Sequence, residues 1–247
     1  MKPPVDVLAV AAHPDDAEVG CGGALLLAAD AGHRVAVADL SAGELSTSGS
    51  PDERARERDR AAEILGLAER VGLGLPDAAL GTDPSHCDAI VELLRELRPR
   101  IVLAPHTDDR HPDHAAAGRL TREAAFLAGL SRRGSGSPHR PARVYHYLMH
   151  HPFEPTFVLD VTDVWERRMS AVAAYESQFG RPEEAQQTEI GQPAFLELLT
   201  ARAAFYGAMV GAARGEPYRS QGPLRQDGLP GLAEPREAGR RPYRVFV

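Results

Sequence analysis

The sequence predicts an α/β protein with a Rossmann-like, doubly wound and mainly parallel sheet that carries helices on both faces. Along residues 5–130, short apolar runs alternate with segments of helical periodicity. Such alternation joins parallel strands through helical crossovers, which pack on both faces of the sheet. The 247 residues, of which 43% are hydrophobic, are enough for a sizeable core, and we expect one α/β domain over residues 1–247.

The first half of the chain predicts four strands that alternate with four helices. The run VDVLAVAA at residues 5–12 is continuously apolar, which is typical of a strand buried on both faces. Pro51 suits the first turn of the second helix, and Pro99 ends the third. The predicted strands cover residues 5–12, 34–40, 71–75 and 101–104, and the predicted helices cover residues 22–32, 51–65, 85–97 and 113–130.

The second half predicts a loop, two more strands, two more helices and an irregular end. The loop is RRGSGSPHRP at residues 132–141, where glycine, serine and proline break any periodicity. The strands are expected at residues 143–149 and 157–161, and the helices at residues 163–177 and 193–212. Residues 213–247 are rich in Pro, Gly and Arg, so we expect an irregular extension there with an edge strand at residues 243–247.

Composition and charge exclude several classes of protein. The formal net charge of −7 and a pI near 5.8 argue against a nucleic-acid binder, which must neutralise phosphates. The apolar run near the N-terminus is too short for a signal peptide or a membrane-spanning helix. Cys21 and Cys87 lie far apart, which disfavours a disulfide framework, and we expect a cytoplasmic protein.

Two related motifs follow two of the predicted strands. HPDD at residues 13–16 comes directly after the first strand, and HPDH at residues 111–114 comes shortly after the fourth. In open α/β sheets, ligands bind beyond the carboxyl ends of the strands. If these two strands are neighbours, the two loops face each other and form one shell. Its candidate side chains are His13, Asp15, Asp16, His111, Asp113 and His114.

Histidine nitrogens together with a carboxylate are a normal ligand set for Zn²⁺, and two histidines with one carboxylate also suit Fe²⁺. Three ligands leave the other candidate side chains to act as acid, base or orienting group. Each motif also has a purely structural interpretation. Asp15 and Glu18 have the spacing of a helix capping box, and a single His-Pro sequence is usually a turn. The repetition of a His-Pro-Asp core at two strand ends favours a metal site.

At these residues the sequence resembles the zinc-dependent LmbE/PIG-L-type deacetylases, which remove acetyl groups from N-acetylglucosamine conjugates. AHPDDAE at residues 12–18 and HPDH at residues 111–114 carry the resemblance, which spans most of residues 5–212. Further pieces are similar to the bacterial enzymes of bacillithiol synthesis. They are DLSAGELSTSG (39–49), LPDAALGTD (75–83), DRHPDH (109–114), EAAFLAGL (123–130) and YESQF (175–179).

The resemblance implies a role for each residue of the first motif. His13 and Asp16, together with His114 of the second motif, match the family's metal ligands. Asp15 matches the general base that activates water. The resemblance further implies Zn²⁺ as the cofactor, with Fe²⁺ or another divalent metal as the alternative. It also implies a homo-oligomeric protein whose binding partner is a small sugar-conjugate substrate.

The second motif and its surroundings are implied to handle the substrate. His111 matches the residue that stabilises the tetrahedral intermediate and protonates the amine, and Asp113 matches the carboxylate that orients His111. We expect His111 to start protonated, because a nearby Asp113 favours the cation. Arg54 matches an arginine thought to face the substrate, and Tyr218 lies in a tail that is loosely like the family's tyrosine-containing tail.

The bacillithiol branch implies N-acetylglucosaminyl L-malate as the substrate. Its two carboxylates require a basic clamp, for which Arg54 and Arg110 are the candidates, and Ser46 is a candidate for binding sugar hydroxyls. One alternative is a related metal-dependent amidase that acts on another glucosaminide or on a thiol conjugate. A nucleotide-binding module is the other alternative, but GCGG at residues 20–23 does not fit G-x-G-x-x-G.

Overall fold

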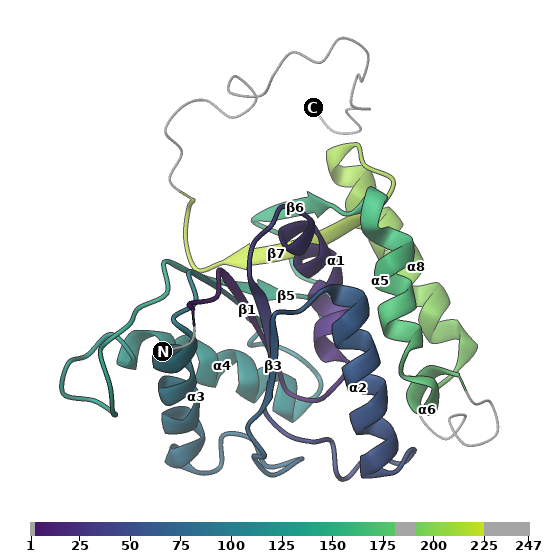
Figure 1. Cartoon of the computed structure of the whole chain (residues 1–247). Helices are drawn as coiled ribbons and strands as arrows, with labels where there is room; N and C mark the ends of the chain where they lie inside the picture. The colour runs from purple at the N-terminus through teal and green to yellow at the C-terminus, as the bar shows by residue number, and fades with distance from the viewer. Residues whose placement is uncertain (1–2, 181–190, 225–247) are drawn as a thin grey trace.

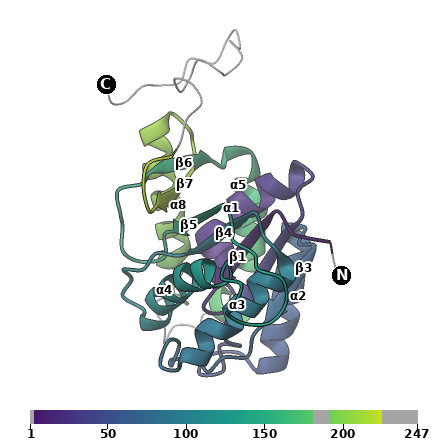
Figure 2. The same cartoon turned by 90° about the vertical axis from the view of Figure 1, so that its left-hand side faces the viewer.

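The sheet has seven strands in the order β3-β2-β1-β4-β5-β7-β6, with helices on both faces (Figures 1 and 2). These elements come from a computed structural model, which describes residues 3–180 and 191–224. The first five strands of this order are parallel, whereas β7 runs antiparallel to both of its neighbours. The strands are β1 (Val7–Ala11), β2 (Val35–Asp39), β3 (Glu69–Gly72), β4 (Ile101–Pro105), β5 (Arg143–Tyr147), β6 (Phe157–Asp160) and β7 (Gly215–Ser220).

The helices form two layers around the sheet, and each layer closes an apolar core. On one face, α3 and α4 bury Ile90, Leu94 and Ala124 against the sheet. On the other face, α1, α5 and α8 bury Leu25, Trp165 and other apolar side chains. The helices are α1 (Asp16–Asp30), α2 (Pro51–Leu65), α3 (Pro84–Leu97), α4 (Pro112–Leu127), the 3₁₀ turn η1 (Thr162–Val164), α5 (Trp165–Ala173), α6 (Glu176–Phe179) and α8 (Pro193–Val210).

The predicted adjacency of the first and fourth strands is confirmed. Val7 pairs with Ile101 of β4 on one side and with Val35 of β2 on the other. The strand order therefore reverses at β1, which places the carboxyl ends of β1 and β4 side by side at a topological switch point. The two loops that carry the His-Pro-Asp motifs both start from this edge of the sheet.

Helix α1 begins six residues earlier than the sequence predicted, and it contains a kink. It starts at Asp16, and Cys21 has non-helical backbone angles (φ −144°, ψ 16°). Its glycines allow close packing: a Cβ on Gly20 would clash with the Tyr147 ring, and one on Gly23 would lie 2.6 Å from Val161. These glycines therefore lie within α1 and let it approach Tyr147 and Val161 closely.

The expected boundaries of the third strand were wrong by two residues or more. The strand covers Glu69–Gly72 instead of residues 71–75, because its register follows the pairing with β2. A search for apolar residues does not detect the polar first half of this strand. There the Arg70 side chain is buried in ion pairs with Asp39 and Glu18.

The expected irregular extension over residues 213–247 is wrong at Gly215–Ser220, which form β7 within the sheet. Pro217 is tolerated there because the pairing with β5 starts only at Tyr218, so Pro217 has a sheet partner on the β6 side alone. The other prediction for this region, an edge strand at residues 243–247, lies outside the described residues.

A side chain of strand β7 also caps the second half of α1, which follows the kink of that helix. The buried carboxylate of Glu216 accepts hydrogen bonds from the backbone amides of Gly23 and Ala24, each at 2.9 Å, and from the Tyr218 hydroxyl at 2.5 Å. These amides start the second half of α1, where a helix favours negative charge. The strand that sequence patterns missed thus caps the helix that carries the first motif.

Replacing Glu216 by Ala is expected to lower the free energy of unfolding by about 3–5 kcal/mol, because a buried charge is removed and its partners are left unpaired. Urea unfolding followed by circular dichroism measures this change. Glu197→Ala, at an exposed position of α8, is the matched control and should stay within about 0.5 kcal/mol of the parent protein. Equal midpoints for the two variants would contradict the capping role.

Candidate metal centre and active site

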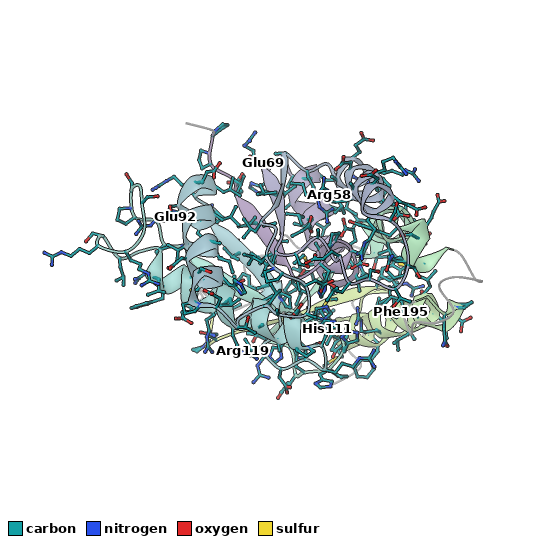
Figure 3. All side chains as sticks on the ribbon, turned by 90° about the horizontal axis from the view of Figure 1, so that it is seen from below. Arg58, Glu69, Glu92, His111, Arg119 and Phe195 are labelled. Carbon is teal, nitrogen blue, oxygen red and sulfur yellow. The ribbon has the colours of Figure 1, made fainter. Side chains whose placement is uncertain are left out.

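The two motif loops meet at the switch point, as the sequence predicted. His13 follows β1, and His111 and His114 lie at the start of α4, which follows β4. The imidazole centroid of His13 lies 4.9 Å from that of His111 and 5.4 Å from that of His114. Figure 3 shows the molecule from below, with His111 labelled on this side.

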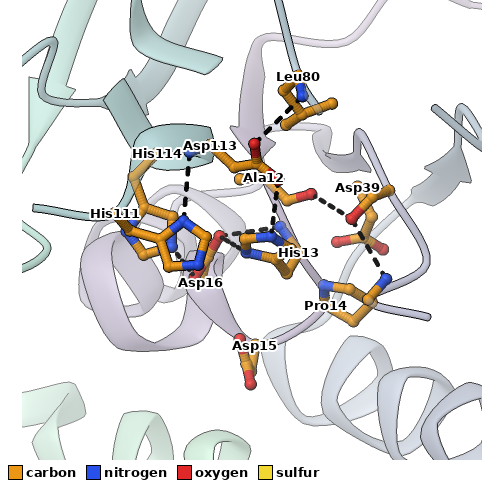
Figure 4. Close-up of polar contacts among 12 residues, drawn as sticks. Ala12, His13, Pro14, Asp15, Asp16, Asp39, Leu80, His111, Asp113 and His114 are labelled. Carbon is orange, nitrogen blue, oxygen red and sulfur yellow. Dashed lines mark hydrogen bonds and ion pairs between the residues drawn. The ribbon is translucent and has the colours of Figure 1, made fainter. Parts of the chain in front are cut away.

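Three of these side chains could hold a metal ion. Ligand atoms of His13, Asp16 and His114 all lie within 4.8 Å of one another. Asp16 has an oxygen 3.1 Å from Nε2 of His114 and another 3.4 Å from Nδ1 of His13 (Figure 4). Two imidazoles and one carboxylate, all largely buried, fit a divalent cation with an open coordination position.

A carboxylate outside the motifs orients one of the candidate ligands. Oδ1 of Asp109 lies 3.2 Å from Nδ1 of His114, which directs Nε2 of that ring toward Asp16. The same carboxylate contacts Nδ1 of His150 at 2.8 Å and accepts from the backbone amide of His111. Such a carboxylate behind a histidine ligand is a common support of metal sites. Sequence reasoning missed Asp109, although it lies in the quoted piece DRHPDH.

Acidic side chains also surround His13. Its Nε2 lies 3.1 Å from Asp77 and 3.4 Å from Asp113. Burial opposes a charge on this ring, but the carboxylates of Asp113, Asp16 and Asp77 outweigh it and raise the pKa of His13 to about 12. Burial likewise opposes a charge on His114, yet Asp16 and Asp109 raise its pKa to about 9. The same negative electrostatic potential that raises the pKa of both histidines would also attract a divalent cation.

Asp15 occupies a strained position beside this cluster. Its backbone is left-handed, with φ 105°, at the N-cap of α1, and its side chain makes no capping hydrogen bond. Such angles cost a non-glycine residue of the order of 1–3 kcal/mol and concentrate at functional sites. The capping-box interpretation is therefore wrong: Glu18 pairs with Arg70 at 2.6 Å instead. Figure 4 shows the Asp15 side chain pointing away from the His13 ring.

The surroundings of Asp15 set its protonation. Its side chain is buried, and the Arg54 guanidinium lies 3.6 Å from its carboxylate. Burial raises the pKa of Asp15 to about 7, in spite of the opposing charge of Arg54. A carboxyl group with a pKa near neutrality can both accept and donate a proton at physiological pH.

The surroundings of His111 favour its neutral form, in contrast to the expected protonated form. It is the N-cap of α4, and its Nδ1 accepts a hydrogen bond from the backbone amide of Asp113. Burial lowers its pKa, and the charges of His114 and His13 lower it further, which outweighs Asp16 and Asp113. A neutral His111 therefore carries its proton on Nε2. The Asp113 carboxylate accepts from the amides of Ala78 and Leu80.

A cavity of about 420 Å³ opens onto these residues. Arg54, Arg110 and Ser46 line it, as expected for residues that meet a substrate. Arg54 is almost fully buried, however, and donates to the carbonyl oxygens of Pro14 and Gly43, so its contact with Asp15 is part of the loop structure. Ser46 donates to the carbonyl oxygen of Ser48.

The structure does not place Tyr218 in this cavity. Its side chain is 0% exposed, it stacks on Phe157, and its hydroxyl donates to Glu216. The expected contact of Tyr218 with a substrate is therefore corrected to a core position in β7. The cavity wall also includes Asp77, which lies in the piece LPDAALGTD, and His150, which follows β5.

The two cysteines are not poised for chemistry. Cys21 and Cys87 are both free and buried. Burial raises the pKa of each thiol, that of Cys87 to about 11, so both stay protonated at neutral pH. Among the described residues, no helix is both long and apolar enough to cross a membrane.

Comparison with known proteins finds the same family. Residues 8–125 match the model of the PIG-L family, described as GlcNAc-PI de-N-acetylase. The chain is 33% identical over 229 residues to a diacetylchitobiose deacetylase of Thermococcus kodakarensis, with 86% of this chain and 82% of the relative covered. It is 27% identical over 191 residues to a probable N-acetyl-α-D-glucosaminyl L-malate deacetylase of Bacillus cereus, covering 70% of this chain and 83% of the relative.

A solved structure matches the fold over almost its whole length. It is that of a conserved protein from Thermus thermophilus, which superposes with a TM-score of 0.84 at 38% sequence identity. The match covers 92% of this chain and 98% of the other. The expected α/β architecture with a mainly parallel sheet is thereby confirmed.

Proposed function

The chain belongs to the PIG-L family of de-N-acetylases, and from that premise we propose that it hydrolyses the acetamide of an N-acetylglucosamine conjugate with the help of a bound Zn²⁺. Its relatives show that the chain is an N-deacetylase of substrates containing N-acetylglucosamine. One observation carries the proposal of a metal-dependent reaction. His13, Asp16 and His114 could hold a metal ion in the cavity that Asp15 and His111 also line.

His13, Asp16 and His114 would hold the cation, with Asp109 fixing the ring of His114. A divalent cation at such a site lowers the pKa of a water molecule and polarises an acyl oxygen. Asp15 takes a proton from the attacking water, for which its raised pKa makes it a competent base near neutral pH. Arg54 keeps the loop of Asp15 in place through the Pro14 carbonyl.

His111 stabilises the oxyanion that develops on the acetyl oxygen when water attacks the carbonyl carbon. Its Nδ1 is used by the Asp113 amide, so Nε2–H is its free donor. A neutral imidazole with this tautomer donates a hydrogen bond but is too weak an acid to transfer its Nε2 proton to the amine. In this scheme the departing amine therefore receives its proton from Asp15, which holds the one taken from water. This changes the role that the sequence resemblance implied for His111.

The activity is expected to depend on one ionisation near pH 7. Asp15 must be deprotonated to act, and burial places its pKa at about 7, so kcat/KM should fall below that pH and level off above it. The measurement is the pH profile of acetate release at saturating metal, because protons also compete with the metal for His13 and His114. A flat profile between about pH 5.5 and 8 would rule out this ionisation.

Replacing His111 by Gln tests whether His111 acts as a hydrogen-bond donor or as a general acid. The Gln amide can replace Nε2–H, so we expect His111→Gln to keep kcat/KM within about tenfold of the parent, whereas His111→Ala loses about 10²–10³-fold. Acetate release under equal metal loading measures both. If Gln and Ala lose activity equally, His111 acts as the acid and the scheme with a neutral imidazole is wrong.

We propose N-acetylglucosaminyl L-malate as the substrate, in agreement with the relative of that name in Bacillus cereus and with the matching sequence pieces of the bacillithiol branch. Arg110 is the candidate for binding a carboxylate, because it is exposed and lines the cavity, whereas Arg54 is almost fully buried. N,N′-Diacetylchitobiose is the second candidate, supported by the 33% identity to a deacetylase of that name.

Acetate release from three compounds distinguishes these substrates: N-acetylglucosaminyl L-malate, diacetylchitobiose and free N-acetylglucosamine. The proposal predicts the highest kcat/KM for the malate conjugate and a loss of that preference in Arg110→Ala. The matched control is Arg133→Ala, whose side chain pairs with Asp88 on the surface. A preference for chitobiose, or one that Arg110→Ala leaves unchanged, would overturn the assignment of malate.

We further propose a single domain over residues 1–247, a homo-oligomeric state and a cytoplasmic location. The first two can be measured on the purified chain. One cooperative unfolding transition and a mass of at least two copies by light scattering are expected. Two separate transitions, or the mass of one 26.6 kDa chain, would contradict them.

A further inference from the structure

A second cavity lies directly beside the metal cavity. Its volume is about 690 Å³, and it shares Arg110, Met149, His150 and Phe195 with the cavity of about 420 Å³ that contains the candidate metal ligands. Figure 3 shows the labelled His111 and Phe195 close together on this side of the molecule. Because four residues belong to both walls, the two cavities adjoin, and a molecule held at the metal cavity can extend into the second one.

One face of α8 supplies much of the wall. Ala194, Leu198, Ala201 and Phe205 recur at intervals of three or four residues, so they lie on one side of the helix. Leu198 and Phe205 are 57% and 64% exposed. Exposed apolar surface beside a binding cavity is typical of a ligand groove.

The two polar side chains that α8 contributes to this wall are already engaged. The Arg202 guanidinium donates to the carbonyl oxygens of Met149 and Val19, and the Tyr206 hydroxyl donates to that of Phe153. Burial accordingly lowers the pKa of Arg202 to about 10. These two side chains therefore offer a ligand their hydrocarbon and ring surfaces rather than hydrogen bonds.

We propose that the second cavity is an aglycone subsite that takes an apolar aryl or alkyl group of an N-acetylglucosaminide. This inference rests on the proposed deacetylase function, which places the acetamide at the metal cavity. Malate has no apolar group of this kind, so the subsite extends the range of substrates to conjugates with a larger, apolar end. The continuity of the two cavities argues for a substrate group rather than for a second copy of the chain.

The test compares methyl and benzyl glycosides of N-acetylglucosamine, in both anomers, by acetate release. For the preferred anomer we expect kcat/KM to be at least about tenfold higher with the benzyl group, since a phenyl ring leaves water. Phe205→Ala should reduce that ratio by about tenfold. The matched control is Phe126→Ala, because Phe126 is 58% exposed on α4 and packs under Arg140; its ratio should stay that of the parent protein.

Calorimetry with the two deacetylated glycosides, which cannot react, measures binding to the subsite independently of deacetylation. Tighter binding of the benzyl compound that Phe205→Ala abolishes supports the subsite, even if no acetate is released and the proposed function fails. Equal binding and equal turnover of both glycosides would overturn the subsite and leave the deacetylase function standing. A changed mass of Phe205→Ala by light scattering, with an unchanged glycoside ratio, would instead assign this face to contacts between copies and overturn the proposal.

Discussion

Replacing Asp16 by Asn is expected to weaken the binding of a divalent cation by more than about a hundredfold and to abolish deacetylation at limiting metal. The Asp16 carboxylate lies close to both candidate histidine ligands. Removing an outer-shell partner already costs about 10–100-fold in affinity, and an anionic ligand contributes more. Metal titration by calorimetry measures the loss directly.

The fold should survive this change, since Asn retains an oxygen that can accept from the His13 amide, as Asp16 does at 2.9 Å. Asp88→Asn is the matched control, because Asp88 forms a surface ion pair with Arg133. Its metal affinity should equal that of the parent protein. If Asp16→Asn also binds metal as the parent does, the three-residue site is wrong.

The second large effect is expected for Asp15→Asn, which should lower kcat by about 10²–10⁴-fold while metal binding stays unchanged. Asp15 is not among the three candidate ligands, and its contact in the cavity is with Arg54. Asn tolerates a left-handed backbone better than most residues, so the φ of 105° can be kept. The loss therefore reports the missing base and not a collapsed loop.

Activity and metal content are measured on the same sample of this variant. A chemically matched control is Asp108→Asn, since Asp108 is exposed and its carboxylate lies 3.5 Å from His151 outside the cluster. That control should keep the parent's kcat. Full activity of Asp15→Asn would remove Asp15 from the mechanism, and a parallel loss of metal would assign it to the metal site instead.

The sequence allowed a correct prediction of the parallel half of the sheet and of the place of the site. Apolar alternation is strong from β1 to α4, and the repeated His-Pro-Asp core marks the ends of β1 and β4. Local patterns suffice there, because each crossover joins strands that follow one another in the chain. The helix over Pro51–Leu65 has the predicted bounds for the same reason.

Features that depend on distant segments could not be predicted in this way. β7 enters the sheet antiparallel between β5 and β6, and its Pro and Gly content hides it. Asp77 reaches His13 from a loop 64 residues away, and the Asp109 carboxylate contacts both the His114 ring on α4 and the His150 ring in the loop after β5. The tautomer of His111 follows from its capping of α4, which no residue pattern indicates.

The central claim is that a cation held by His13, Asp16 and His114 makes this chain a deacetylase. The direct test strips the protein with a chelator, adds back Zn²⁺ in steps, and follows bound metal and acetate release from N-acetylglucosaminyl L-malate and diacetylchitobiose together. We predict that both rise in parallel and saturate at about one ion per chain, and that neither does so in Asp16→Asn. Acetate release by metal-free protein, or full metal binding without any acetate release, would contradict the account.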